Sequence, residues 1–86
     1  MHRVEFTRNA KKSLDALPKP AGDRIALAVA ALCDEPRRRG EKLEKAEALY
    51  RIRVGQYRVI YEVRDQELIV LVIRVAKRDE RTYRRL

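Results

Sequence analysis

The chain has few of the residues from which small enzymes build metal sites or nucleophilic triads. It contains one histidine, His2, one cysteine, Cys33, and one serine, Ser13. A metal site needs several Cys, His or carboxylate ligands at short regular spacings, and the sequence shows no such pattern. Ser–His or Cys–His catalysis is disfavoured for the same reason. We therefore expect no metal and no cofactor.

Disulfides, glycine loops and long apolar runs are scarce as well. One cysteine cannot form an internal disulfide, which is typical of a reducing cytosol, and Cys33 is expected to be a small buried hydrophobic residue. Three scattered glycines cannot form a phosphate-binding loop. The longest apolar run, Leu68–Ile73, is too short to span a bilayer, and nothing resembles a signal peptide. We expect a soluble, cytoplasmic protein.

What the sequence does have is positive charge. Its 86 residues include 21 Lys or Arg against 13 Asp or Glu, a net charge of +8, with 45% hydrophobic residues. This length and composition predict one small folded domain, residues 1–86. The charge predicts a polyanionic partner, which could be nucleic acid, an anionic membrane surface or an acidic protein.

The stretch Leu49–Val63 predicts a tight β-hairpin. Apolar and charged residues alternate on both sides of Gly55-Gln56, a two-residue turn of the Gly-X kind. This register sets Arg53 directly opposite Arg58, with Arg51 on the same face. Like charges that face each other across two strands are destabilising. Either an anion lies between these arginines, or they extend into solvent as an ordinary charged surface.

The remaining periodicity predicts a two-layer α+β domain in the order β-α-α-β-β-β. Thr7 is a plausible N-cap for the first helix, and prolines punctuate the chain between the helices. We expect the helical hairpin to pack on one face of an antiparallel sheet, with the first strand at an edge and the arginines on the uncovered face. The expected elements are a strand at His2–Phe6, a helix from Thr7 that ends at Pro18, a helix at about Ala21–Cys33, a basic loop at Arg37–Gly40, a connecting segment with one helical turn at most at Glu41–Ala48, the hairpin, a turn at Arg64–Gln66, and a strand at Glu67–Ala76.

The carboxyl-terminal stretch is a second basic cluster and could form a short helix. Tyr83 lies among several arginines there, and cations with an interleaved aromatic ring suit single-stranded nucleic acid. A basic tail is also often no more than a solvated segment. An inventory of Arg, Lys, Tyr and Glu can serve RNA cleavage, in which the substrate's own 2′-hydroxyl is the nucleophile.

Three stretches together resemble the RelE/ParE toxin superfamily over essentially the whole chain: FTRNAKKSLDALP, KLEKAEALYRIRVGQYRVIYEV and LIVLVIRVAKRDERTYRRL. The resemblance implies a RelE-like β-α-α-β-β-β fold. Members of the RelE branch enter the ribosomal A site and cut mRNA without a metal, leaving a 2′,3′-cyclic phosphate and a 5′-hydroxyl. A cognate antitoxin wraps around them and neutralises them. Members of the ParE branch share the fold and poison DNA gyrase.

The resemblance also implies catalytic residues. Arg51 and Arg53 occupy positions where RelE-type enzymes carry lysines, and Arg58 matches the arginine that stabilises charge on the scissile phosphate. Arg78 matches a general acid or phosphate clamp, and Tyr83 falls near a tyrosine that stacks on the nucleotide. Arginine is a poor general base. The acceptor of the 2′-hydroxyl proton is therefore open among Glu41, Glu44, Glu47, Tyr83 and an activated water.

The leading prediction is a ribosome-dependent mRNA endonuclease toxin. The alternatives are a ParE-like gyrase inhibitor and a non-catalytic binding module with a toxin fold. Expected partners are an antitoxin with an acidic segment, the ribosome and mRNA, but no membrane, and the free toxin is expected to be a monomer. Basic residues expected to contact RNA through charge alone are Lys11, Lys12, Arg37, Arg38, Arg39, Lys77 and Arg81.

Overall fold

The hairpin expected around Gly55 is present in the computed structural model, which describes residues 2–43 and 49–77. Strand β3 (Leu49–Val54) pairs with β4 (Tyr57–Arg64), and Arg53 lies directly opposite Arg58. Gly55 has a φ of 60°, a left-handed conformation that glycine adopts without steric cost. The Gly-X turn therefore sets the register that the alternation predicts.

This hairpin lies within a five-stranded sheet in the order β1-β5-β4-β3-β2. Strand β5 (Ile69–Lys77) lies between β4 and β1 (Arg3–Phe6), as its nearly continuous apolar sequence indicates. The α+β fold and the edge position of the first strand are confirmed. The sheet is mixed, however, because β1 runs parallel to β5 while the other neighbours are antiparallel. A long connection, rather than a tight turn, joins these two strands, so local sequence does not fix their relative direction.

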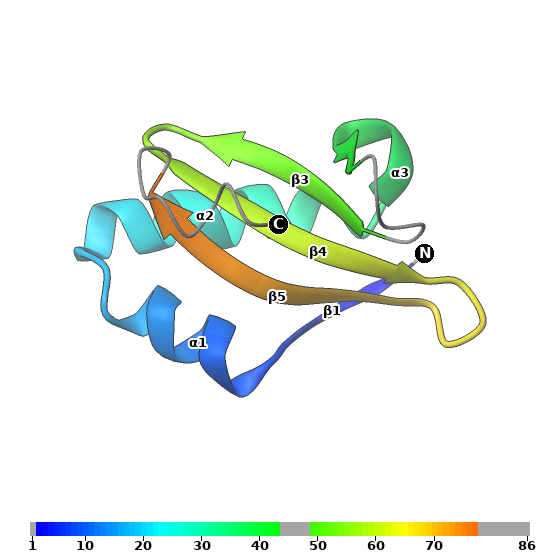
Figure 1. The fold of residues 1–86 in the computed structure, drawn as a ribbon, viewed down its shortest axis with the longest axis horizontal. Coiled ribbons are helices and arrows are strands. Elements are labelled where there is room, and N and C mark those ends of the chain that lie inside the picture. Colours follow the sequence, from blue (N-terminus) through cyan, green and yellow to red (C-terminus); the bar gives the residue numbers. More distant parts are fainter. Residues whose placement is uncertain (1, 44–48, 78–86) are drawn as a thin grey trace.

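The two long helices lie against this sheet. In Figure 1, α2 (Lys19–Ala31) crosses behind the strands and α1 (Arg8–Asp15) lies beside β5. Thr7 is the predicted N-cap, and its Oγ1 accepts a hydrogen bond from Ala10 N at 3.2 Å. Helix α2 begins and ends two residues earlier than expected, because Pro20 fits in its first turn, where the missing N–H is not needed. Among the described residues, no helix is long and apolar enough to cross a membrane.

The segment between α2 and the hairpin differs from the sequence prediction. The expected basic loop is a four-residue helix, α3 (Pro36–Arg39), and the connecting segment begins with a two-residue strand, β2 (Glu41–Lys42). Pro36 occupies the first helical turn, which its fixed φ favours. A strand as short as β2 shows no alternation in sequence. The rest of that segment, 44–48, and the expected terminal helix lie outside the described residues.

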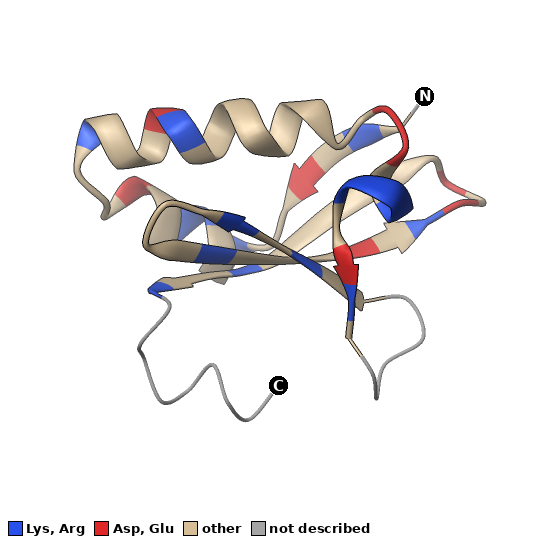
Figure 2. Ribbon diagram, turned by 90° about the horizontal axis from the view of Figure 1, so that it is seen from above, with Lys and Arg blue, Asp and Glu red and all other residues tan. Residues whose placement is uncertain are grey.

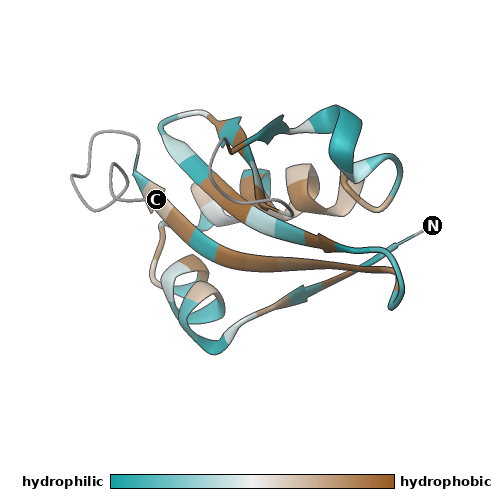
Figure 3. Cartoon of the chain, turned by 45° about the vertical axis from the view of Figure 1, so that its right-hand side comes forward, coloured by the Kyte–Doolittle hydropathy of each residue, from teal (hydrophilic) through white to brown (hydrophobic). Residues whose placement is uncertain are grey.

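The core fills the space between α2 and one face of the sheet. Ile25, Val29 and Leu32 of the second helical pattern are buried against Tyr61, Val70 and other strand residues, and Figure 3 shows the apolar segments of β4 and β5 side by side. Fully burying each such side chain contributes roughly 1.5–3 kcal/mol. Because successive strand residues face opposite ways, the arginines are left on the face away from α2.

Candidate functional site

Three arginines lie together on the sheet face turned away from α2. Arg53 and Arg58 are partners across β3 and β4, and Arg51 lies two residues before Arg53 on the same face. Figure 2 shows Lys and Arg positions, in blue, within the strands of the sheet beneath α2. Arg53 is exposed, while Arg51 and Arg58 are half-buried. Like charges held this close create a positive potential that favours a bound anion.

A carboxylate from β2 joins these arginines. Glu41 is the register partner of Arg51, and Arg51 Nε donates a hydrogen bond to Glu41 Oε1 at 3.0 Å. This hydrogen bond and the charge of Arg51, followed by the charges of Arg53 and Arg58, lower the pKa of Glu41 below its usual value. Glu41 is therefore ionised at neutral pH, and the four side chains form one electrostatic unit, here called the Arg–Glu cluster.

The Arg–Glu cluster borders an open hollow of about 450 Å³, lined by Arg39, Gly40, Glu41, Arg51 and Arg53. Guanidinium groups can bind phosphate oxygens through two parallel N–H bonds, and an ionised carboxylate can accept a proton. The hollow thus combines anion binding with a possible base. Within residues 2–43 and 49–77, no three His, Cys, Asp or Glu side chains are grouped so that they could hold a metal ion.

The structure brings Arg39 to this site, although its Nε donates to the backbone oxygen of Asp34 at 3.0 Å, and gives two other expected RNA-binding residues partners elsewhere. Arg37 donates to Asp65 through Nη1 at 2.8 Å and Nη2 at 2.5 Å, and Arg38 donates to Glu35 at 3.2 Å. Any RNA phosphate would compete with these carboxylates for the two guanidinium groups.

The expected lysines lie away from the cluster. Lys11 of α1 pairs with Asp15 at 2.9 Å, and Lys12 is exposed on the same helix. Lys77 is opposite Tyr57, which places it on the helix-bearing side of the sheet rather than with the arginines. The catalytic candidates Arg78 and Tyr83, with Arg81, lie outside the described residues.

Sequence reasoning left Arg74 out of the site and named Glu41 only as one of several candidate proton acceptors. Arg74 is opposite Ile60, so it lies on the same face of the sheet as Arg58. The pairing of β4 with β5 shifts register immediately after this pair, between Ile60 and Tyr61. The basic residue that interrupts an apolar run was the available signal for Arg74. Glu41 gave no signal of its own, because the strand that carries it is too short to recognise.

Comparisons with known proteins agree with this fold. The family model for the ParE toxin of type II toxin–antitoxin systems, parDE, matches residues 4–82. The chain belongs to the RelE/ParE toxin superfamily. A RelE-like toxin protein from Escherichia coli is 31% identical over 80 residues, which cover 91% of this toxin and 84% of that protein.

Two solved RelE complexes are also similar to this toxin. The archaeal RelE–RelB complex from Pyrococcus horikoshii OT3 contains a chain with 32% identity and a TM-score of 0.78, covering 92% of this toxin and 97% of that chain. The RelBE2 toxin–antitoxin complex from Mycobacterium tuberculosis contains one with 29% identity and a TM-score of 0.81, covering 90% and 98%. The resemblance and the fold expected from the sequence are thus confirmed.

Proposed function

We propose that this toxin is an endoribonuclease that cuts mRNA in the ribosomal A site. The observation that carries the proposal is the Arg–Glu cluster, in which Glu41 pairs with Arg51 and lies within the electrostatic influence of Arg53 and Arg58. Similarity to a RelE-like toxin supports the same function. Cleavage by the substrate's 2′-hydroxyl needs cations at the phosphate and a proton acceptor, and this cluster supplies both.

In the proposed reaction, the 2′-oxygen attacks phosphorus and the bond to the 5′-oxygen breaks. Arg53 and Arg58 would bind the non-bridging oxygens, on which negative charge grows in the transition state. Arg51 would hold the RNA backbone. Arg78 would clamp the phosphate or protonate the leaving 5′-oxygen, and Tyr83 would stack on a base; these two roles rest on the family resemblance.

Glu41 is the proton acceptor that the described residues offer. Its lowered pKa makes it a weak base while Arg51 donates to it. A phosphate that binds Arg51 competes with this hydrogen bond, so substrate binding would itself make Glu41 more basic. Glu44, Glu47 and Tyr83, the other side chains considered for this role, lie outside the described residues.

A second candidate function is inhibition of DNA gyrase, which the match to the ParE toxin model favours. On this alternative, the Arg–Glu cluster would have no need to act on a phosphodiester. For either function, we propose a cytoplasmic toxin neutralised by an antitoxin, as RelB accompanies RelE in the similar complexes. An acidic antitoxin segment would match the net charge of +8.

The two functions separate in a paired assay on the pure toxin. Primer extension on mRNA, with and without ribosomes, should show cuts that require ribosomes, while gyrase supercoiling should continue. Lys19→Ala is a matched control, because it removes an exposed cation far along the chain from the cluster. Supercoiling inhibition without any RNA cut would contradict the endoribonuclease proposal and support the gyrase one.

A further inference from the structure

The segment that carries Glu41, made of α3 and β2, is too short to be stable in isolation. Helix α3 has four residues and β2 has two. An isolated helix of one turn is unstable in water because nucleation is unfavourable. The position of Glu41 beside Arg51 therefore depends on the pairing of β2 with β3 and on the contacts that α3 and Gly40 make with the rest of the protein.

One of these contacts is made by Tyr61, on the other face of the sheet from the arginines. Its Oη donates a hydrogen bond to the carbonyl oxygen of Pro36, the first residue of α3, at 2.6 Å. Tyr61 is 0% exposed, and its ring stacks on Tyr50 with centroids 5.8 Å apart. Burial raises the pKa of Tyr61 to about 12, so the hydroxyl keeps its proton and remains a donor at neutral pH.

Gly40 joins α3 to Glu41 and packs against the same hydroxyl. A Cβ at this position would overlap Tyr61 Oη and would lie 3.1 Å from the backbone oxygen of Arg51. The φ of Gly40 is −113°, which other residues adopt freely, so space rather than backbone conformation requires glycine here. The chain thus passes tightly between Tyr61 and Arg51 immediately before Glu41.

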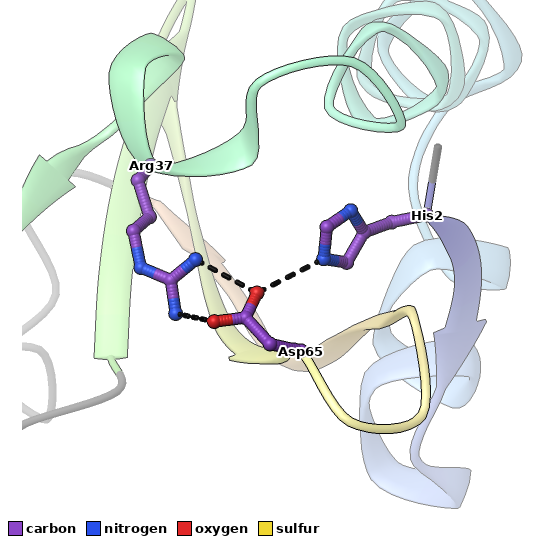
Figure 4. Close-up of polar contacts among 3 residues, drawn as sticks. All are labelled: His2, Arg37 and Asp65. Carbon is purple, nitrogen blue, oxygen red and sulfur yellow. Dashed lines mark hydrogen bonds and ion pairs between the residues drawn. The ribbon is translucent and has the colours of Figure 1, made fainter.

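A second contact links α3 to the turn between β4 and β5 and to the start of the chain. Asp65, in the turn between β4 and β5, accepts from both terminal nitrogens of Arg37 and lies 3.2 Å from His2 Nε2 (Figure 4). The side chains of Arg37 and Asp65 are 49% and 56% exposed. Solvent screens such an ion pair, so it is the weaker of the two contacts.

From these contacts we infer that Tyr61 is a positioning residue for the proposed site. Its hydroxyl holds Pro36 and leaves room only for glycine at position 40, and together with the pairing of β2 and β3 these contacts place Glu41 against Arg51. The Arg37–Asp65 pair adds a smaller restraint on α3. This inference rests on the proposed function for its effect on RNA cleavage, but its effect on the Glu41–Arg51 contact is independent of any activity.

The direct test is an NMR titration of the Glu41 carboxyl, assigned by comparison with Glu41→Gln. In Tyr61→Phe, we expect the pKa of Glu41 to rise toward the ordinary carboxyl value, because the hydrogen bond from Arg51 becomes weaker. Asp65→Asn should also raise the pKa of Glu41, but by less than Tyr61→Phe does. Tyr57→Phe, which removes a tyrosine hydroxyl at the first residue of β4, should leave the pKa of Glu41 unchanged.

Circular dichroism identifies which variants are folded. Gly40→Ala disturbs the same contact without altering Tyr61, and Asp65→Asn changes an exposed side chain, so the test does not depend on Tyr61→Phe alone. If the pKa of Glu41 stays at its wild-type value in all the folded variants of this set, the inference is wrong.

Cleavage kinetics separate this inference from the proposed function. With Tyr61→Phe, we expect kcat to fall about 10-fold and the acidic limb of the pH profile to move, because small displacements of a base reduce rates strongly. KM should stay the same, since Arg53 and Arg58 are retained. If the pKa of Glu41 moves and the wild-type toxin cuts no RNA, the positioning role stands and the function fails. If the wild-type toxin cuts RNA and Tyr61→Phe changes neither the pKa of Glu41 nor kcat, the proposed function stands and the positioning role fails.

Discussion

The two faces of the central sheet use the same strands for opposite purposes. On β4, Val59 and Tyr61 face α2 and are 0% exposed, whereas Arg58 faces the other way and meets Arg53. The first set removes apolar surface from water and stabilises the fold. The second set holds like charges together, which opposes folding unless a carboxylate or an anion lies between them. Val59 and Tyr61 thus carry stability and Arg58 carries the proposed function, although Ile60, which shares the face of Arg58, is also buried.

The largest expected effect tests this separation with two neighbouring residues. Arg58→Ala should reduce the cleavage rate by at least about 100-fold and leave the free energy of unfolding nearly unchanged, because it removes a phosphate-binding cation from the open face. Val59→Ala should destabilise the protein by about 2 kcal/mol through a core cavity and leave the rate per folded molecule unchanged. Ribosome-dependent cleavage and urea unfolding measure the two quantities. Equal loss of stability in both variants would contradict the separation.

Glu41→Gln should have the next largest effect on the cleavage rate. It also separates RNA binding from the chemical step, because we expect the two to change in opposite directions. Without the carboxylate, cleavage should fall by roughly 100-fold if Glu41 accepts the proton. RNA binding should become tighter, because the arginines lose their negative neighbour. Filter binding and single-turnover cleavage test the two effects. A variant that cuts RNA as fast as the wild-type toxin would exclude Glu41 as the base.

Tyr61→Phe should reduce cleavage less than the two preceding arginine-face variants do, and it should also destabilise the fold. Losing the hydroxyl leaves the Pro36 carbonyl without this donor and should cost about 1–3 kcal/mol. The raised pKa of Tyr61 stabilises the fold fully below the ordinary tyrosine pKa, and this contribution is lost as pH rises through about 12. Wild-type protein should therefore lose stability in strong alkali more steeply than Tyr61→Phe. Parallel curves in unfolding experiments across alkaline pH would contradict this.

The smallest predicted effect concerns Asp65→Asn. The hydrogen bond from Arg37, followed by the one from His2, lowers the pKa of Asp65. Its stabilising contribution is therefore present above the ordinary Asp pKa and lost as pH falls through the lowered value. Asp65→Asn should melt slightly below wild type at neutral pH, and the difference should vanish in acid. Gln66→Asn, in the same turn, should show no such pH dependence in thermal melts.

The sequence predicts the two faces well because both follow from local alternation. Gly55 fixes a two-residue turn, and the turn fixes the pairing of Arg53 with Arg58. Glu41 could not be singled out, since its contact with Arg51 depends on a four-residue helix and a buried hydroxyl that is distant in sequence. The parallel pairing of β1 and the register of Arg74 likewise depend on long-range packing rather than on neighbouring residues.

The most direct test of the arginine face is single-turnover cleavage of ribosome-bound mRNA that carries either a 2′-hydroxyl or a 2′-hydrogen at the cut position. Wild-type toxin should cut the first RNA, leaving a 5′-hydroxyl end, and should leave the second intact; Arg58→Ala should cut neither at a comparable rate. Cleavage of the 2′-deoxy substrate, or an undiminished rate with Arg58→Ala, would contradict a phosphodiester site built on Arg51, Arg53 and Arg58.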